Sequence, residues 1–147
     1  MRATDDKNAG DRTGRTGRMQ DSVGVAKDVY EAFGRGDVPA IFGLFHPEAE
    51  VYQSARLPWG GEFGGHEELG VFLSKLTGAV ESEVETGRFI DDEDGHVVQN
   101  GHTRGTVRET GARFEVPETH LWTVEDGKVV RFESYVDTAK MRAVLGL

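Results

Sequence analysis

The side chains best suited to acid–base or metal chemistry are five histidines, because the chain has no cysteine. They are His46, His66, His96, His102 and His120. His66 begins the segment HEEL, which lacks the second histidine of the HExxH zinc motif. His102 and His120 fall on neighbouring expected strands and could face each other, but the sequence offers no obvious third ligand. We therefore expect no metal site.

A second candidate site is the stretch LPWGGEFGG, which surrounds two aromatic residues with glycines. Glycine enters tight backbone conformations freely, and Pro58 favours an extended Leu57, so this stretch is expected to form a structured loop. Trp59 and Phe63 are its bulky side chains, and they either line the rim of a cavity or close the end of a core. The stretch lacks the lysine and the Ser/Thr of a phosphate-binding loop, so we expect no nucleotide and no other cofactor.

Acidic side chains are numerous, but their positions favour structural roles. The run Asp91–Asp94 lacks the glycine that a calcium loop has at its sixth position, so it predicts a solvated hairpin tip. Asp137 precedes a short apolar helix pattern, and we expect it to cap that helix rather than to act as a base.

The charge of the chain excludes two classes of partner. The formal net charge is −9, and residues 1–20 carry five basic and three acidic side chains, which leaves −11 on residues 21–147. A domain this acidic repels nucleic acid and anionic membranes, and no apolar run is long enough to span a bilayer. Residues 1–20 are polar and aperiodic and lack the apolar core of a signal peptide. They predict a disordered tail on a cytoplasmic protein.

The elements that must position these residues follow from periodicity and turn signals. Apolar spacing predicts helices after Asp21 or Ser22, Asp37, Gly65 and Asp137. The turn dipeptides Asp94-Gly95, Thr110-Gly111 and Asp126-Gly127 separate strands near residues 80–91, 96–109, 112–125 and 128–137, and a further strand is expected near 49–54. An antiparallel meander beside segregated helices argues for one α+β domain over residues 21–147.

Three segments resemble a known family. VYEAFGRGDVPAIFGLFHPEAEVY, LPWGGEFGGHEEL and HLWTVEDGKVVRFESYVDTA are similar to the nuclear transport factor 2-like superfamily, in its SnoaL-like, ketosteroid isomerase-related branch. The resemblance covers about residues 21–147. It implies a cone-shaped, curved antiparallel sheet with helices packed on its concave face, a deep apolar pocket between them, and frequently a homodimer through the outer face of the sheet.

The resemblance also identifies where steroid isomerases carry their reactive groups. The matching positions hold Val29 in place of the tyrosine, Gln53 in place of the carboxylate base and Thr119 in place of the protonated acid. Tyr30 is adjacent to Val29 but rotated by about 100° on the helix, so we do not expect it to substitute. The steroid-isomerase mechanism is therefore not expected, and no catalytic residue is assigned.

Strand alternation extends the comparison to the pocket walls. By analogy to the isomerases, Thr119 and Leu121 are expected to face the pocket, and His120 to face a dimer partner together with Val116 and Trp122. On the last strand Phe132 and Ser134 are expected inside, with Arg131, Glu133 and Tyr135 outside. The candidate ligand-binding residues are Val29, Gln53, Trp59, Phe63, His102, Thr119, Leu121, Phe132 and Ser134.

Two functions remain open at this point. One is a SnoaL-like protein that binds a small, largely apolar molecule in the cone, as an enzyme of the isomerase, cyclase or hydrolase type. The other is a non-catalytic module for ligand binding or dimerisation. The expected partners in either case are a small apolar molecule and a second copy of the chain.

Overall fold

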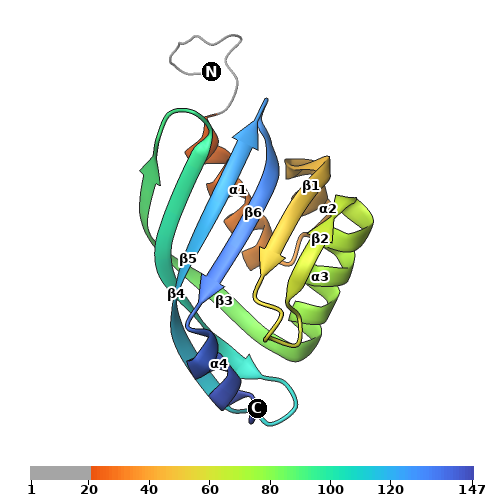
Figure 1. Ribbon diagram of the computed structural model, residues 1–147, viewed down its shortest axis with the longest axis vertical. Coiled ribbons are helices and arrows are strands. Elements are labelled where there is room, and N and C mark those ends of the chain that lie inside the picture. Colours follow the sequence, from red (N-terminus) through yellow and green to blue (C-terminus); the bar gives the residue numbers. More distant parts are fainter. Residues whose placement is uncertain (1–20) are drawn as a thin grey trace.

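The computed structural model describes residues 21–147, which form four helices and six strands (Figure 1). The helices are α1 (Ser22–Gly34), α2 (Val38–Leu44), α3 (Gly65–Ala79) and α4 (Thr138–Val144). The strands are β1 (Phe45–Gln53), β2 (Gly61–Gly64), β3 (Val80–Asp91), β4 (His96–Val107), β5 (Arg113–Glu125) and β6 (Lys128–Val136). Among these helices, none has the length and apolar character needed to cross a bilayer. The expected tail, residues 1–20, lies outside the described residues.

One curved sheet contains all six strands in the order β2-β1-β6-β5-β4-β3. Strands β3 to β6 form the expected antiparallel meander. The sheet is mixed, because β1 pairs in parallel with β6; the expected antiparallel pairing holds for the other strand pairs but not for this one. After β1 the chain turns back through β2, which was not expected, and crosses the sheet along α3 to start β3 at the far edge (Figure 1). This path leaves β1 beside the last strand, and the α+β assignment holds.

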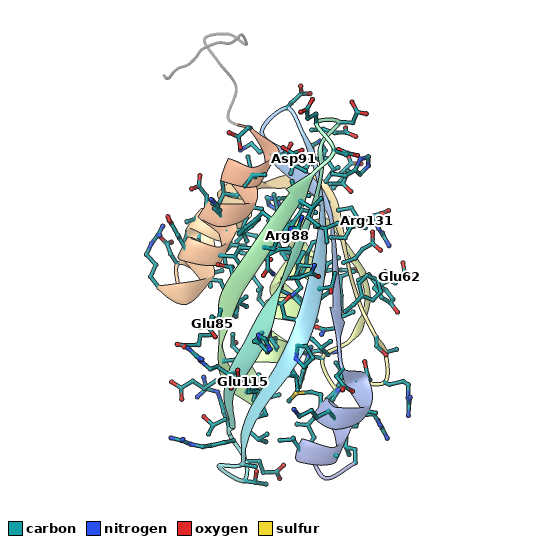
Figure 2. The ribbon with its side chains drawn as sticks, turned by 90° about the vertical axis from the view of Figure 1, so that its left-hand side faces the viewer. Glu62, Glu85, Arg88, Asp91, Glu115 and Arg131 are labelled. Carbon is teal, nitrogen blue, oxygen red and sulfur yellow. The ribbon has the colours of Figure 1, made fainter. Side chains whose placement is uncertain are left out.

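Helices α1, α2 and α4 begin at aspartate caps that satisfy free backbone N–H groups, whereas α3 follows Gly64 and has no side-chain cap. Asp21 accepts from the N–H of Gly24 at 2.7 Å, Asp37 from that of Ala40 at 3.1 Å and Asp137 from that of Lys140 at 3.0 Å. The cap predicted for Asp137 is thereby confirmed. Helix α1 packs behind the sheet in Figure 1, and α3 packs against β1 and β2 at the right of the same view. Figure 2 shows Arg131 on the side of the sheet away from α1.

The loop between β1 and β2 is closed tightly under Trp59, which is 3% exposed. The N–H of Leu57 donates to the carbonyl of Ser54 at 3.1 Å, and the N–H of Gly60 donates to the carbonyl of Leu57 at 2.9 Å. A Cβ atom at Gly60 would lie 1.7 Å from the Ser54 carbonyl oxygen, so only glycine fits there. The glycines of this loop therefore let the backbone fold back on β1 and bury the indole.

Candidate functional site

A cavity of about 110 Å³ lies between the sheet and the helices. Its walls are mainly apolar, with Val29 and Phe33 from α1, Phe72 and Leu76 from α3, and Phe132 from β6. A cavity of somewhat larger volume, about 150 Å³, holds benzene in another protein, so this one is large enough for a single small ring. Five of the half-buried lining residues come from the ends of α1 and α3 and from the adjoining parts of β3 and β4: Phe33, Leu76, Ser82, Val84 and Thr103.

Strand β5 faces the cavity with the opposite set of side chains from the one expected. Val116, His120 and Trp122 line the cavity, whereas Thr119 and Leu121 do not. The predictions that Thr119 and Leu121 point inward and that His120 points to a dimer partner are therefore wrong. Val116, His120 and Trp122 are buried in the core, so they cannot share an outer surface with Tyr135, which is 46% exposed.

A β-bulge accounts for this reversal. The hairpin between β5 and β6 starts with Glu125 opposite Lys128 and Val124 opposite Val129, and this register would set Leu121 opposite Phe132. The pairing then shifts by one residue, so that Trp122 lies opposite Phe132, and Val130 is the extra residue. A shift of one residue moves every later side chain of a strand to the other face relative to its partner.

Four polar side chains form one row across the sheet, and three of them, Gln53, Ser134 and His120, line the cavity. Gln53 on β1 is opposite Ser134 on β6, Ser134 is opposite His120 on β5, and His120 is opposite Gln99 on β4. All four are buried, with 0% to 6% of their surface exposed. Paired residues on one face of a sheet are near neighbours, so an apolar cavity here has a continuous polar stripe.

The hydroxyl of Tyr30 joins one end of this row to α1. It lies 2.7 Å from Nδ1 of His120, and it accepts from Gln99 Nε2 at 3.0 Å and from Trp122 Nε1 at 3.1 Å. Because the oxygen already accepts two hydrogen bonds, its own proton is donated to Nδ1 of His120. His120 is therefore the neutral tautomer that carries its proton on Nε2.

Glu118 completes this cluster. Its carboxylate accepts from Gln99 Nε2 at 3.0 and 3.1 Å, and one oxygen is 3.6 Å from Nε2 of His120. Gln99 is held in place because its own Oε1 accepts the N–H of Gly87 at 2.9 Å. Gly87 is the extra residue of a bulge on β3, so the glutamine side chain satisfies a backbone group that has left the regular strand pairing.

Burial sets the protonation of the cluster. It lowers the pKa of His120 from 6.5 to about 3 and raises the pKa of the Tyr30 phenol. Burial also raises the pKa of Glu118, and the hydrogen bond from Gln99 opposes that shift. At neutral pH both titratable side chains that line the cavity, Tyr30 and His120, are uncharged.

At the other end of the row, Gln53 and Ser134 keep polar atoms free. The indole N–H of Trp59 donates to Oε1 of Gln53 at 3.0 Å. Since an indole nitrogen can only donate, this contact identifies the amide oxygen and directs Nε2 elsewhere. Within residues 21–147, neither Nε2 of Gln53 nor the hydroxyl of Ser134 has a hydrogen-bond partner. Both ring nitrogens of His120 are directed to Tyr30 and Glu118, so Ser134 has no adjacent base to activate it as a nucleophile.

The structure brings together five of the nine candidate residues around the cavity: Val29, Gln53, Trp59, Phe132 and Ser134. The other four lie elsewhere. Phe63 packs on Phe72 with ring centroids 5.4 Å apart, His102 is exposed, and Thr119 donates to Oδ1 of Asn100 at 2.8 Å. Leu121, between Thr119 and the bulge, is also outside the cavity.

The cavity residues missed at the sequence level include Tyr30, His120 and Trp122. Tyr30 was excluded because it is rotated from Val29, yet both line the cavity. The apolar face of a helix is at least about 100° wide, so neighbouring residues can share it. For the two β5 residues the signal was the strand itself, whose alternate positions Phe114, Val116, Trp122 and Val124 are apolar.

Across residues 21–147 the structure has no group of three or more His, Asp or Glu side chains placed to hold a metal ion. The polar side chains that line the cavity are uncharged hydrogen-bonding groups at neutral pH.

Comparisons with known proteins agree with this architecture. None of the curated proteins matches the chain. An NTF2-like protein of unknown function from Burkholderia pseudomallei is 26% identical, with 88% of this chain and 100% of that one covered and a TM-score of 0.80. TerC, co-crystallised with polyporic acid, is 24% identical, with coverage of 86% and 98% and a TM-score of 0.77.

A third solved structure, from Catenulispora acidiphila, has a ketosteroid isomerase-like fold and was obtained in complex with trimethylamine. It is 17% identical, with coverage of 84% and 92% and a TM-score of 0.72. At 24% and 17% identity, TerC and the Catenulispora acidiphila structure support the assignment of the fold alone. The SnoaL-like domain family matches residues 26–132. The chain therefore belongs to the SnoaL-like family, within the NTF2-like superfamily.

Proposed function

We propose that the protein binds a small, largely apolar molecule in the cavity between the sheet and helices α1 and α3. The observation that carries this proposal is the pair of buried, unpartnered polar groups, Gln53 Nε2 and the Ser134 hydroxyl, in a cavity with mainly apolar walls. A buried polar group without a partner costs about 1–3 kcal/mol, which a bound molecule can offset. An apolar pocket with a few polar groups that fix orientation is the usual form of a small-molecule site.

The protonation of the site favours binding over acid–base catalysis. A general acid or base works best when its pKa is near the working pH. Burial moves the pKa of His120 down to about 3 and that of Tyr30 up, so neither side chain exchanges a proton readily at neutral pH. No lysine, arginine or carboxylate is among the residues that line the cavity in the described part of the chain. We therefore favour a binding protein over an isomerase, cyclase or hydrolase.

The test is a titration with benzene that compares two tryptophan variants of α3. Leu76 lines the cavity, whereas Val71 on the same helix is 43% exposed. Wild-type protein should bind benzene saturably, as seen in the emission of Trp59 and Trp122, which both line the cavity. Leu76→Trp fills the space and should weaken binding at least about tenfold, a loss of about 1.4 kcal/mol, while the control Val71→Trp binds as wild type does. Equal affinity in both variants would place benzene outside the cavity and refute the proposal.

A further inference from the structure

We infer that the molecule bound in this cavity is uncharged and carries a carbonyl oxygen, which accepts hydrogen bonds from Nε2 of Gln53 and from the hydroxyl of Ser134. This inference rests on the proposed function and names the class of ligand that the site selects.

The first support is the orientation of the Gln53 amide. Its oxygen is occupied by the indole N–H of Trp59 at 3.0 Å, so the group left free is an NH₂, which can only donate. Gln53 is 5% exposed and lines the cavity, so bulk water does not readily satisfy this donor. A ligand that complements it must present a hydrogen-bond acceptor.

The second support is the position of Ser134 beside Gln53. The two residues are direct partners across the parallel pair of β1 and β6, and both line the cavity. Ser134 is 6% exposed, and its hydroxyl has no hydrogen-bond partner in the described chain, so this hydroxyl can also donate to a ligand. Two donors on adjacent strands suit one oxygen atom with two lone pairs, which is what a carbonyl group offers.

The third support is electrostatic, and it excludes an anionic ligand. A carboxylate in this cavity would lose its hydration, and none of the described lining residues is a lysine or an arginine that could pair with it. Glu118, whose carboxyl group lies 3.6 Å from Nε2 of His120, would in its ionised form repel an anion in the cavity. A neutral oxygen is the acceptor that these surroundings allow.

The volume limits the rest of the molecule. About 110 Å³ holds a five- or six-membered ring rather than a polycyclic system unless the chain moves. The walls next to the donors are aromatic, with Phe132 opposite Trp122 at a centroid distance of 4.3 Å. These walls contribute contact area to the ring while the two donors orient its oxygen.

The experiment compares cyclopentanone with methylenecyclopentane, which has the same shape but no acceptor. Each net hydrogen bond contributes roughly a fivefold gain in affinity, so wild type should bind the ketone about thirtyfold more tightly than the hydrocarbon. Ser134→Ala should reduce this preference to about fivefold. Thr103→Val is the matched control, because Thr103 also lines the cavity but lies outside the polar row, and it should keep the wild-type preference.

The outcomes separate the two proposals. If both probes bind equally well to wild type, the two donors are satisfied by water and the carbonyl assignment is wrong, although the cavity remains a binding site. If Thr103→Val loses the preference and Ser134→Ala keeps it, the donor is wrongly identified. If neither probe nor benzene binds, the proposed function fails and this inference fails with it. The wild-type comparison stands by itself should a variant fail to fold.

Discussion

Replacing Tyr30 with phenylalanine should destabilise the protein far more than the loss of one hydroxyl usually does. The Tyr30 oxygen contacts His120 Nδ1, Gln99 Nε2 and Trp122 Nε1 at 2.7, 3.0 and 3.1 Å. In Tyr30→Phe the amide of Gln99 keeps its contacts with Glu118, but the other two groups lose their partner. Trp122 is 2% exposed and His120 is 5% exposed, so water reaches neither easily.

The magnitude follows from those two orphaned groups. Each buried polar group left without a partner costs about 1–3 kcal/mol, so the free energy of unfolding should fall by about 2–6 kcal/mol. This is a large share of the 5–15 kcal/mol that is typical for a domain. The ring of Tyr30 remains in place, so the change reports on the hydroxyl and not on a new cavity.

Urea unfolding measures the effect, and Tyr135→Phe is the control. Tyr135 also donates its hydroxyl proton to a single side chain, Glu133, at 2.6 Å, but it is 46% exposed. Its loss should change the free energy of unfolding by less than about 0.5 kcal/mol. The midpoint should shift in Tyr30→Phe without a change in slope. If the two variants lost the same small amount, the buried cluster around Tyr30 would not exist as described.

Three further predictions concern acid sensitivity, the β1–β2 loop and self-association. Because burial lowers the pKa of His120 to about 3, the unfolded chain binds a proton between pH 6.5 and 3 that the folded chain does not bind. The free energy of unfolding should therefore fall as the pH is lowered through this window, by up to about 1.4 kcal/mol per pH unit. Urea midpoints measured at a series of pH values should show this decline, and His120→Gln should flatten it. The raised pKa of Glu118 acts with the opposite sign, since its protonation favours the folded state, so Glu118→Gln should make the loss in acid steeper. Gly60→Ala should lower the melting temperature strongly, because the added Cβ would lie 1.7 Å from the carbonyl oxygen of Ser54. The control Gly43→Ala should not, because no atom lies within 4 Å of its added Cβ; equal melting temperatures for the two variants would contradict the loop geometry. We also expect a homodimer through the outer face of the sheet, which Leu121→Glu should dissociate in sedimentation experiments; a wild-type monomer at micromolar concentration would refute it.

Local patterns were sufficient to predict most of the fold. Aspartates before apolar stripes predicted three of the four helix starts, and dipeptides such as Asp126-Gly127 predicted the hairpins, because caps and turns depend on neighbouring residues. The parallel pairing of β1 with β6 could not be predicted in this way. It joins strands at opposite ends of the domain sequence, and no local pattern specifies that contact.

The prediction of the site was correct in part, and the errors in that prediction have one main physical cause. The bulge at Val130 carries no glycine or proline signal, yet it decides which side of β5 faces Phe132 and Ser134. Burial was the better guide, because an apolar alternation ending in Trp122 and Val124 must face the core. The family analogy was followed instead, and it placed Thr119 inside.

The cluster of Tyr30, Gln99, Glu118 and His120 is beyond sequence reasoning for a different reason. Its members come from α1, β4 and β5, and each is polar enough to be expected at the surface. Such side chains are buried only because they satisfy one another, and that mutual arrangement exists only in the folded chain.

The most direct test of the central claim is a crystal structure of the protein grown with cyclopentanone. The account predicts the ring inside the cavity, with its oxygen about 3 Å from both Nε2 of Gln53 and the hydroxyl of Ser134. A ring bound on the outer face of the sheet, or a cavity occupied only by water at a saturating concentration of the ketone, would contradict it.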